Sequence, residues 1–149
     1  MKEINLNRLK LKTFIKQDVL DYCLLNNINP NNITELYLSD NQLTDITGIK
    51  LFKNLKELYI HSNLIKDISV LKDLNKLETL ILNNNQLTDV SVLQNLNKLE
   101  ILNINYLELE SNQIIYIKSL KNLKFLGCIN GFKDMSVINQ LPNNIEINK

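Results

Sequence analysis

The sequence is poor in the residue types on which enzyme chemistry depends. Its 149 residues include one histidine, two cysteines, three glycines and no tryptophan. Three scattered glycines cannot form the glycine-rich loop that holds a phosphate. The histidine, His61, lies beside Ser62, but neighbouring residues of a strand point to opposite faces, so this pair cannot act as a catalytic serine and histidine. We therefore expect no catalytic residues, no cofactor and no small-molecule substrate.

Metal and disulfide sites are disfavoured for the same reason. Cys23 and Cys128 lie near opposite ends of the chain, and a zinc site needs clustered ligands. Acidic residues that recur singly, far apart in the sequence, rarely assemble the six or more oxygen ligands of calcium. We expect no metal, two reduced thiols, and acidic residues that stabilise turns, namely Asp45, Asp67, Asp89 and Asp134.

Long runs of charged or apolar residues are also missing. The net charge is +1, and apolar runs extend over only a few residues. These features disfavour a nucleic-acid-binding arm and a membrane span. The first twelve residues, MKEINLNRLKLK, alternate charged and apolar side chains, unlike a secretory signal. We expect a cytoplasmic protein that is monomeric alone and binds neither nucleic acid nor membrane.

A repeat of 22 residues organises the chain. Segments 33–54, 55–76 and 77–98 are consecutive copies, and Leu99 begins a fourth. We expect the extra residues of this irregular fourth copy in segment 105–111.

Each copy contains the elements of one solenoid turn. The pattern Leu-x-Leu predicts a strand with one buried face, and stacked copies predict a parallel sheet. An asparagine follows each strand by three residues (Asn41, Asn63, Asn85), where its amide can bond backbone groups that have left the sheet. Apolar residues then return at spacing three, which predicts short helical or 3-10 turns. We expect these turns to be capped by Ser69, Ser91 and Ser136.

The repeats predict one domain spanning 1–149. Residues 1–32 are expected to form an N-terminal cap, 33–141 about five repeats, and 142–149 a C-terminal strand. The cap should contain a helix within 14–26. Its apolar residues recur at helical spacing: Val19, Leu20, Cys23 and Leu24.

Four segments carry a family resemblance. They are NQLTDIT at 41–47, NLIKDIS at 63–69, NQLTDVS at 85–91 and GFKDMS at 131–136. The chain resembles the leucine-rich-repeat family, in its 22-residue internalin-like class. It is also similar to the leucine-rich-repeat regulatory subunit of type-1 protein phosphatase. The resemblance implies an α/β solenoid: a horseshoe with a parallel concave sheet, short helical or 3-10 convex turns and an N-terminal cap helix.

The exposed strand positions are the candidate partner-binding surface. Alternation turns them away from the core, and stacking aligns Tyr37, Tyr59 and Ile81 in one row. Tyrosine is common at binding hot spots, although these rings could simply cover the sheet. Acidic residues flank the strands and disfavour a phosphate-rich ligand. The candidate residues are Glu35, Tyr37, Glu57, Tyr59, His61, Thr79, Ile81, Asn83, Ile101 and Asn103.

These features predict a non-catalytic protein-interaction module whose concave face binds another protein, as an intracellular adaptor or regulator. Two alternatives stay open: an internalin-like recognition or effector module, and a structural protein that associates with itself.

The thiols of Cys23 and Cys128 should not be bridged. Several strand spacings of about 4.7–4.9 Å separate the two ends of the solenoid, whereas a disulfide needs Cα atoms within about 7 Å. Alkylation under denaturing, non-reducing conditions followed by mass spectrometry should show both thiols modified. A cross-linked pair in freshly purified protein would contradict this geometry.

Overall fold

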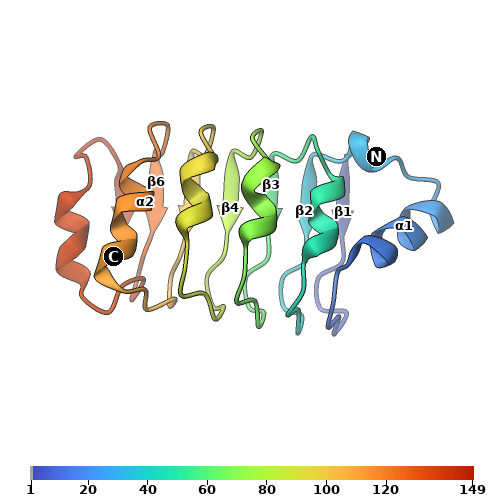
Figure 1. The fold of residues 1–149 in the computed structure, drawn as a ribbon, viewed down its shortest axis with the longest axis horizontal. Coiled ribbons are helices and arrows are strands. Elements are labelled where there is room, and N and C mark those ends of the chain that lie inside the picture. The colour runs from blue at the N-terminus through green and yellow to red at the C-terminus, as the bar shows by residue number, and fades with distance from the viewer. Residues whose placement is uncertain (1) are drawn as a thin grey trace.

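Seven short strands form one open parallel sheet, in the order in which they occur along the chain (Figure 1). This computed structural model describes residues 2–149. The predicted parallel sheet is confirmed. The strands are β1 (Glu3–Asn5), β2 (Glu35–Tyr37), β3 (Glu57–Tyr59), β4 (Thr79–Ile81), β5 (Ile101–Asn103), β6 (Phe125–Gly127) and β7 (Glu146–Asn148).

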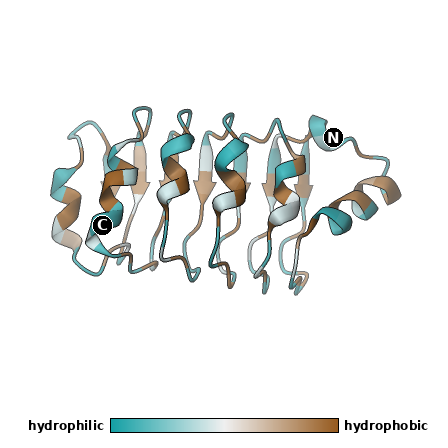
Figure 2. Ribbon diagram, in the orientation of Figure 1, coloured by the Kyte–Doolittle hydropathy of each residue, from teal (hydrophilic) through white to brown (hydrophobic). Residues whose placement is uncertain are grey.

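Short helices line the opposite, convex side. Most are the predicted 3-10 turns, in which apolar and polar residues alternate (Figure 2). Their buried residues include Ile49, Leu71 and Leu93. None of the helices within residues 2–149 has the length and apolarity needed to cross a bilayer. The helices are α1 (Lys16–Leu25), η1 (Pro30–Asn32), η2 (Thr47–Leu51), η3 (Ser69–Asp73), η4 (Ser91–Asn95), η5 (Ser111–Gln113), α2 (Ile114–Lys118) and η6 (Met135–Gln140).

The core is a stack of equivalent apolar side chains between these two layers. Leu36 pairs in register with Leu58, Leu58 with Leu80, and Leu80 with Leu102. All four are fully buried. Because each repeat places the same residue type at the same height, neighbouring layers match in shape, and each repeat buries the apolar face of the next.

The three ladder asparagines bond the backbone where a strand ends, as predicted, and they also join their repeat to the one before it. The Nδ2 of Asn63 donates to the carbonyls of Leu38 (3.0 Å) and Ile60 (3.1 Å). Its Oδ1 accepts from the backbone amide of Leu43 at 2.9 Å. Asn41 and Asn85 make equivalent bonds with their preceding repeats. One buried side chain therefore pairs backbone groups of two repeats where the sheet ends.

The residue just before the ladder position has a left-handed backbone in every repeat. These residues are Arg8, Asp40, Ser62, Asn84, Tyr106 and Asn130, with φ between 47° and 61°. A left-handed backbone conformation costs energy at any residue other than glycine. Among the other residues, Asn and Asp tolerate it best. The reversal turns the chain inward and buries Asn41 and Asn63 at the ladder position, whereas Leu9 in the N-terminal turn is 56% exposed.

The fourth copy keeps its register on the concave side, which corrects our placement of its extra residues. Leu107 occupies the ladder position, and Leu109 bridges Phe132 in the next repeat. The extra residues lie after Ser111, where η5 and α2 replace a single 3-10 turn. A convex helix can lengthen without breaking strand pairing, whereas an insertion in 105–111 would displace the buried Leu107 and Leu109 and break the Leu109 bridge to Phe132.

Aspartates, and not the predicted serines, cap the convex turns. The Oδ1 of Asp67 accepts from the Ser69 amide at 2.7 Å. Asp45, Asp89 and Asp134 accept in the same way from the residue two positions later. Each aspartate precedes the amide that it bonds by two residues, which is the spacing of an Asx turn. The predicted serines begin the turns, so they could cap only amides further along the helix.

The N-terminal segment adds a strand that the sequence analysis does not predict. Strand β1 pairs in parallel with β2, and helix α1 replaces the convex 3-10 turn of this first repeat. A Cβ at Gly48 would lie 2.5 Å from the carbonyl oxygen of Phe14, so glycine allows α1 to pack against η2. Val19 and Cys23 are buried as expected. Leu20 and Leu24 are exposed, because one side of α1 has no following layer to cover it.

Replacing a ladder asparagine should destabilise the fold. Asn63→Ala leaves buried backbone groups without partners, at a cost of about 1–3 kcal/mol in the free energy of unfolding. Asn75→Ala, in an exposed turn, is the matched control and should change little. Urea titration followed by circular dichroism measures both. Equal midpoints for Asn63→Ala and the wild type would disprove the structural role of the ladder.

Candidate functional site

The exposed strand positions form continuous rows across the concave sheet. Backbone pairing places Glu35, Glu57, Thr79 and Ile101 in one row, and Tyr37, Tyr59, Ile81 and Asn103 in the next. The structure thus brings together the residues that alternation predicted, with His61 and Asn83 following at the strand ends. Both rows also extend beyond the predicted set, through Glu3 and Asn5 on β1 and through Phe125 and Gly127 on β6.

Two stacked tyrosines, Tyr37 and Tyr59, lie on this face. The rings of Tyr37 and Tyr59 are parallel within 5°, with centroids 4.7 Å apart. Each hydroxyl donates to the Oε2 of the glutamate in its own strand, at 3.2 Å to Glu35 and 2.7 Å to Glu57. Burial and these carboxylates raise the pKa of both tyrosines above the ordinary value, since each disfavours a phenolate. The stack therefore presents fixed, neutral rings whose polar tips are already satisfied.

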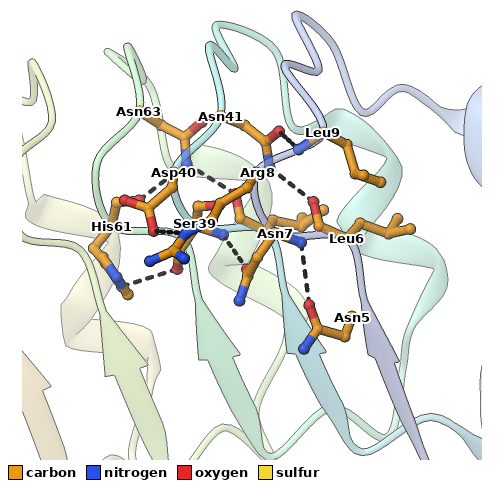
Figure 3. Close-up of polar contacts among 11 residues, drawn as sticks. Asn5, Leu6, Asn7, Arg8, Leu9, Ser39, Asp40, Asn41, His61 and Asn63 are labelled. Atoms are coloured by element: carbon orange, nitrogen blue, oxygen red, sulfur yellow. Dashed lines mark hydrogen bonds and ion pairs between the residues drawn. The ribbon is translucent and has the colours of Figure 1, made fainter.

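A polar network lies beside the stack at the ends of β2 and β3 (Figure 3). The Oγ of Ser39 lies 2.8 Å from the Nδ1 of His61. The amide of Ser39 donates to the Oδ1 of Asn7 at 2.6 Å, and Arg8 pairs with Asp40 at 3.3 Å. Burial lowers the pKa of His61, while the nearby Asp40 opposes that shift. His61 is therefore held in its neutral form.

This serine and histidine are a structural pair. Sequence reasoning compared His61 with adjacent Ser62 and missed Ser39, which lies one repeat away and comes near only through stacking. Ser39 is only 1% exposed, so its hydroxyl cannot reach a substrate. Asp40, the nearby acid, is engaged with Arg8. The geometry therefore lacks an accessible nucleophile and an acid that orients the base.

The unpaired negative charge of the concave side is concentrated at one end, although acidic residues flank several strands. Lys56 neutralises Glu78 at 2.9 Å, and Lys124 neutralises Glu100 at 2.7 Å. Among residues 2–149, Glu35 and Glu57 have no cationic partner within 4.0 Å. The acidic end therefore lies over β2 and β3.

The other end of the face is apolar. Ile101 on β5 is 38% exposed, and the half-buried Phe125 lies beside it on β6. The candidate set omitted Phe125, because the irregular fourth copy separates it from the regular repeats. The spacing of Leu123 and Leu126 could have placed it, since it puts Phe125 in the position of Ile101 within its repeat.

The described part of the chain contains no cluster of side chains that could hold a metal ion. No group of three or more His, Cys, Asp or Glu side chains converges there. Cys23 and Cys128 are buried and free, and burial raises the pKa of both thiols.

Known proteins share this architecture. A family model described as "Leucine Rich repeats (2 copies)" matches residues 31–73. An internalin (InlF) of Listeria monocytogenes has 30% identity and a TM-score of 0.71, over 78% of this chain and 34% of its own. A leucine-rich-repeat protein of Leptospira interrogans has 26% identity and a TM-score of 0.71, over 100% of this chain and 37% of its own. Internalin C2 of L. monocytogenes, with 22% identity and a TM-score of 0.50, shares the fold over 98% of this chain and 79% of its own.

The predicted resemblance is confirmed: the chain contains leucine-rich repeats and is similar in fold to leucine-rich-repeat proteins of the internalin kind. It spans about a third of the length of the first two solved structures. No curated protein sequence matches it. Leucine-rich-repeat folds generally mediate protein–protein interaction, and proteins of this kind are typically non-catalytic.

Acid should destabilise the protein through His61. Its folded pKa lies below its ordinary value near 6.5, so the unfolded chain takes up a proton first as the pH falls. The contribution of His61 to the free energy of unfolding should therefore be constant above about pH 6.5. It should decrease as the pH falls below this value. Urea titrations between pH 5 and 8 should show this loss in the wild type. His61→Gln should remove that part of the loss, and an unchanged pH profile would contradict the shift.

Proposed function

We propose that the concave face binds a partner protein around Tyr37 and Tyr59. The single observation that carries the proposal is the tyrosine stack, 4.7 Å between centroids, on an otherwise open sheet face. Aromatic rings bury a large area on binding, and tyrosine is enriched at hot spots.

The stack also lowers the cost of binding. A side chain that becomes ordered at an interface costs about 0.5–1.5 kcal/mol in conformational freedom. The glutamate bonds and the ring stacking already fix both tyrosines in this structure. A partner would therefore meet a preorganised surface.

We propose a non-catalytic adaptor or regulator that works in the cytoplasm, where its two free buried thiols would stay reduced. The similarity to InlF favours a second candidate, an internalin-like recognition module. Both roles use the same face.

Removing the stack should weaken binding. Affinity capture from a lysate of the source organism, with wild-type and Tyr37→Ala/Tyr59→Ala baits, identifies partners whose recovery depends on this face. For such a partner, Tyr59→Ala should weaken binding by at least about 1 kcal/mol. It should also cost about 0.5–1.5 kcal/mol of stability through the lost ring contact. Tyr59→Phe keeps the stack and separates the two effects, because only the bond to Glu57 is lost.

Lys72→Glu, an exposed change on convex η3, is the control and should leave affinity nearly unchanged. If Lys72→Glu abolishes binding and the tyrosine changes do not, the concave-face proposal fails. Sizing over a range of concentrations separates this function from self-association, for which the protein would grow in size without any partner.

A further inference from the structure

The concave face differs in chemistry between its two ends, and this polarity restricts what it can bind. Along one row of paired positions, carboxylates at Glu35 and Glu57 give way to Thr79 and then to Ile101 and Phe125. The sequence pattern treats these positions as equivalent, so the difference belongs to this chain rather than to the repeat.

The acidic end has capacity for an incoming cation. In Glu35 and Glu57, the tyrosine hydroxyls bind only Oε2. Among the described residues, neither Oε1 has a hydrogen-bond donor or a cation. In contrast, Lys56 and Lys124 already neutralise the carboxylates toward the other end. Charge complementarity therefore favours Lys or Arg at the end of the row over β2 and β3, where Glu3 on β1 continues the carboxylates, and not toward β5 and β6.

The backbone of the sheet favours a helix as the bound segment. Strands β2 to β6 each have paired neighbours on both sides, so their main-chain groups are not available to a ligand. An extended segment lying across them would leave its own amides and carbonyls without sheet partners. A helix satisfies these groups internally and needs only side-chain contacts.

Resting on the proposed function, we propose that the face binds an amphipathic helix of its partner, with basic side chains over Glu35 and Glu57 and apolar ones over Ile101 and Phe125. The helix lies across the strands, and its central apolar stripe covers Tyr59 and its neighbour Ile81. Glu57 and Ile101 are two strand spacings apart, about 10 Å, which a helix covers in about seven residues. Glu35 and Phe125 are four spacings apart, about 19 Å or some thirteen residues.

The test uses a phage-displayed library of alanine-based 18-residue helices randomised along one face, selected on the intact wild-type protein. Selected helices should carry Lys or Arg about seven, eleven or fourteen positions from a large apolar residue, because these spacings keep both side chains on one face of the helix. Their synthetic forms should bind Glu35→Gln/Glu57→Gln and Ile101→Thr at least about fivefold more weakly than wild type. The side-chain oxygen of glutamine can still accept the hydrogen bond from the tyrosine hydroxyl, so the fold is kept. In a synthetic helix whose basic residue is moved to three positions from the apolar one, the preference for wild type over Glu35→Gln/Glu57→Gln should be lost.

Glu78→Gln is the matched control, because it removes a carboxylate already paired with Lys56, and it should leave binding within about twofold. Raising the salt from 0.1 to 1 M shortens the screening length from about 10 to about 3 Å and should weaken wild-type binding more than that of Glu35→Gln/Glu57→Gln.

Selected helices without basic residues, or unaffected by Glu35→Gln/Glu57→Gln, would overturn this inference. If such helices still lose binding with Tyr59→Ala, the proposed function stands and only the partner's chemistry is wrong. If no helix is enriched, or if binding is indifferent to Tyr59→Ala as well, the helix proposal and the concave site both fail for this probe.

Discussion

The structure depends on pairing the backbone at the point where each strand ends. A solenoid turn must leave its sheet after three residues and enter the core, where unpaired amides and carbonyls are costly. Asn63 solves this for two repeats at once, since its side chain bonds groups of its own repeat and of the preceding one. The left-handed residue before it, Ser62, aims it inward. Strand register, core stacking and the concave rows all follow from this reversal.

The ladder does not run the whole length of the chain. Leu9, Leu107 and Gly131 occupy its position in the other repeats. The fold persists there because strand pairing continues from β1 to β7 and the buried leucines still stack. The asparagines therefore strengthen the first half of the solenoid, which is also the half that carries the tyrosine stack.

The concave face combines rigidity with uneven chemistry. Its tyrosines are fixed by stacking and by their glutamates, and the same glutamates keep one oxygen free at the acidic end. Ion pairs such as Lys56 with Glu78 are exposed and add little stability. Their effect here is to cancel charge toward the centre of the sheet, which leaves a contrast between an acidic end and an apolar end. A surface of this kind selects partners by the position of charge as well as by shape.

The sequence determined the features that depend on local periodicity. Leucine spacing alone predicted the parallel sheet and the buried strand residues. The same spacing predicted the outward positions of Tyr37 and Tyr59, because alternation and a 22-residue period leave no other face for them. The placement of Asn85 where its side chain bonds the backbone at the end of a strand followed from the same period.

Tertiary structure decided what depends on neighbours distant in the chain. Only stacking brings Ser39 to His61, and only side-chain packing shows which glutamates meet a lysine. The first strand has a sequence too short and too charged to stand out, yet it forms because β2 offers it a free edge. The extra residues of the fourth copy lie on the convex side because strand pairing tolerates no insertion, whereas a helix can lengthen into solvent.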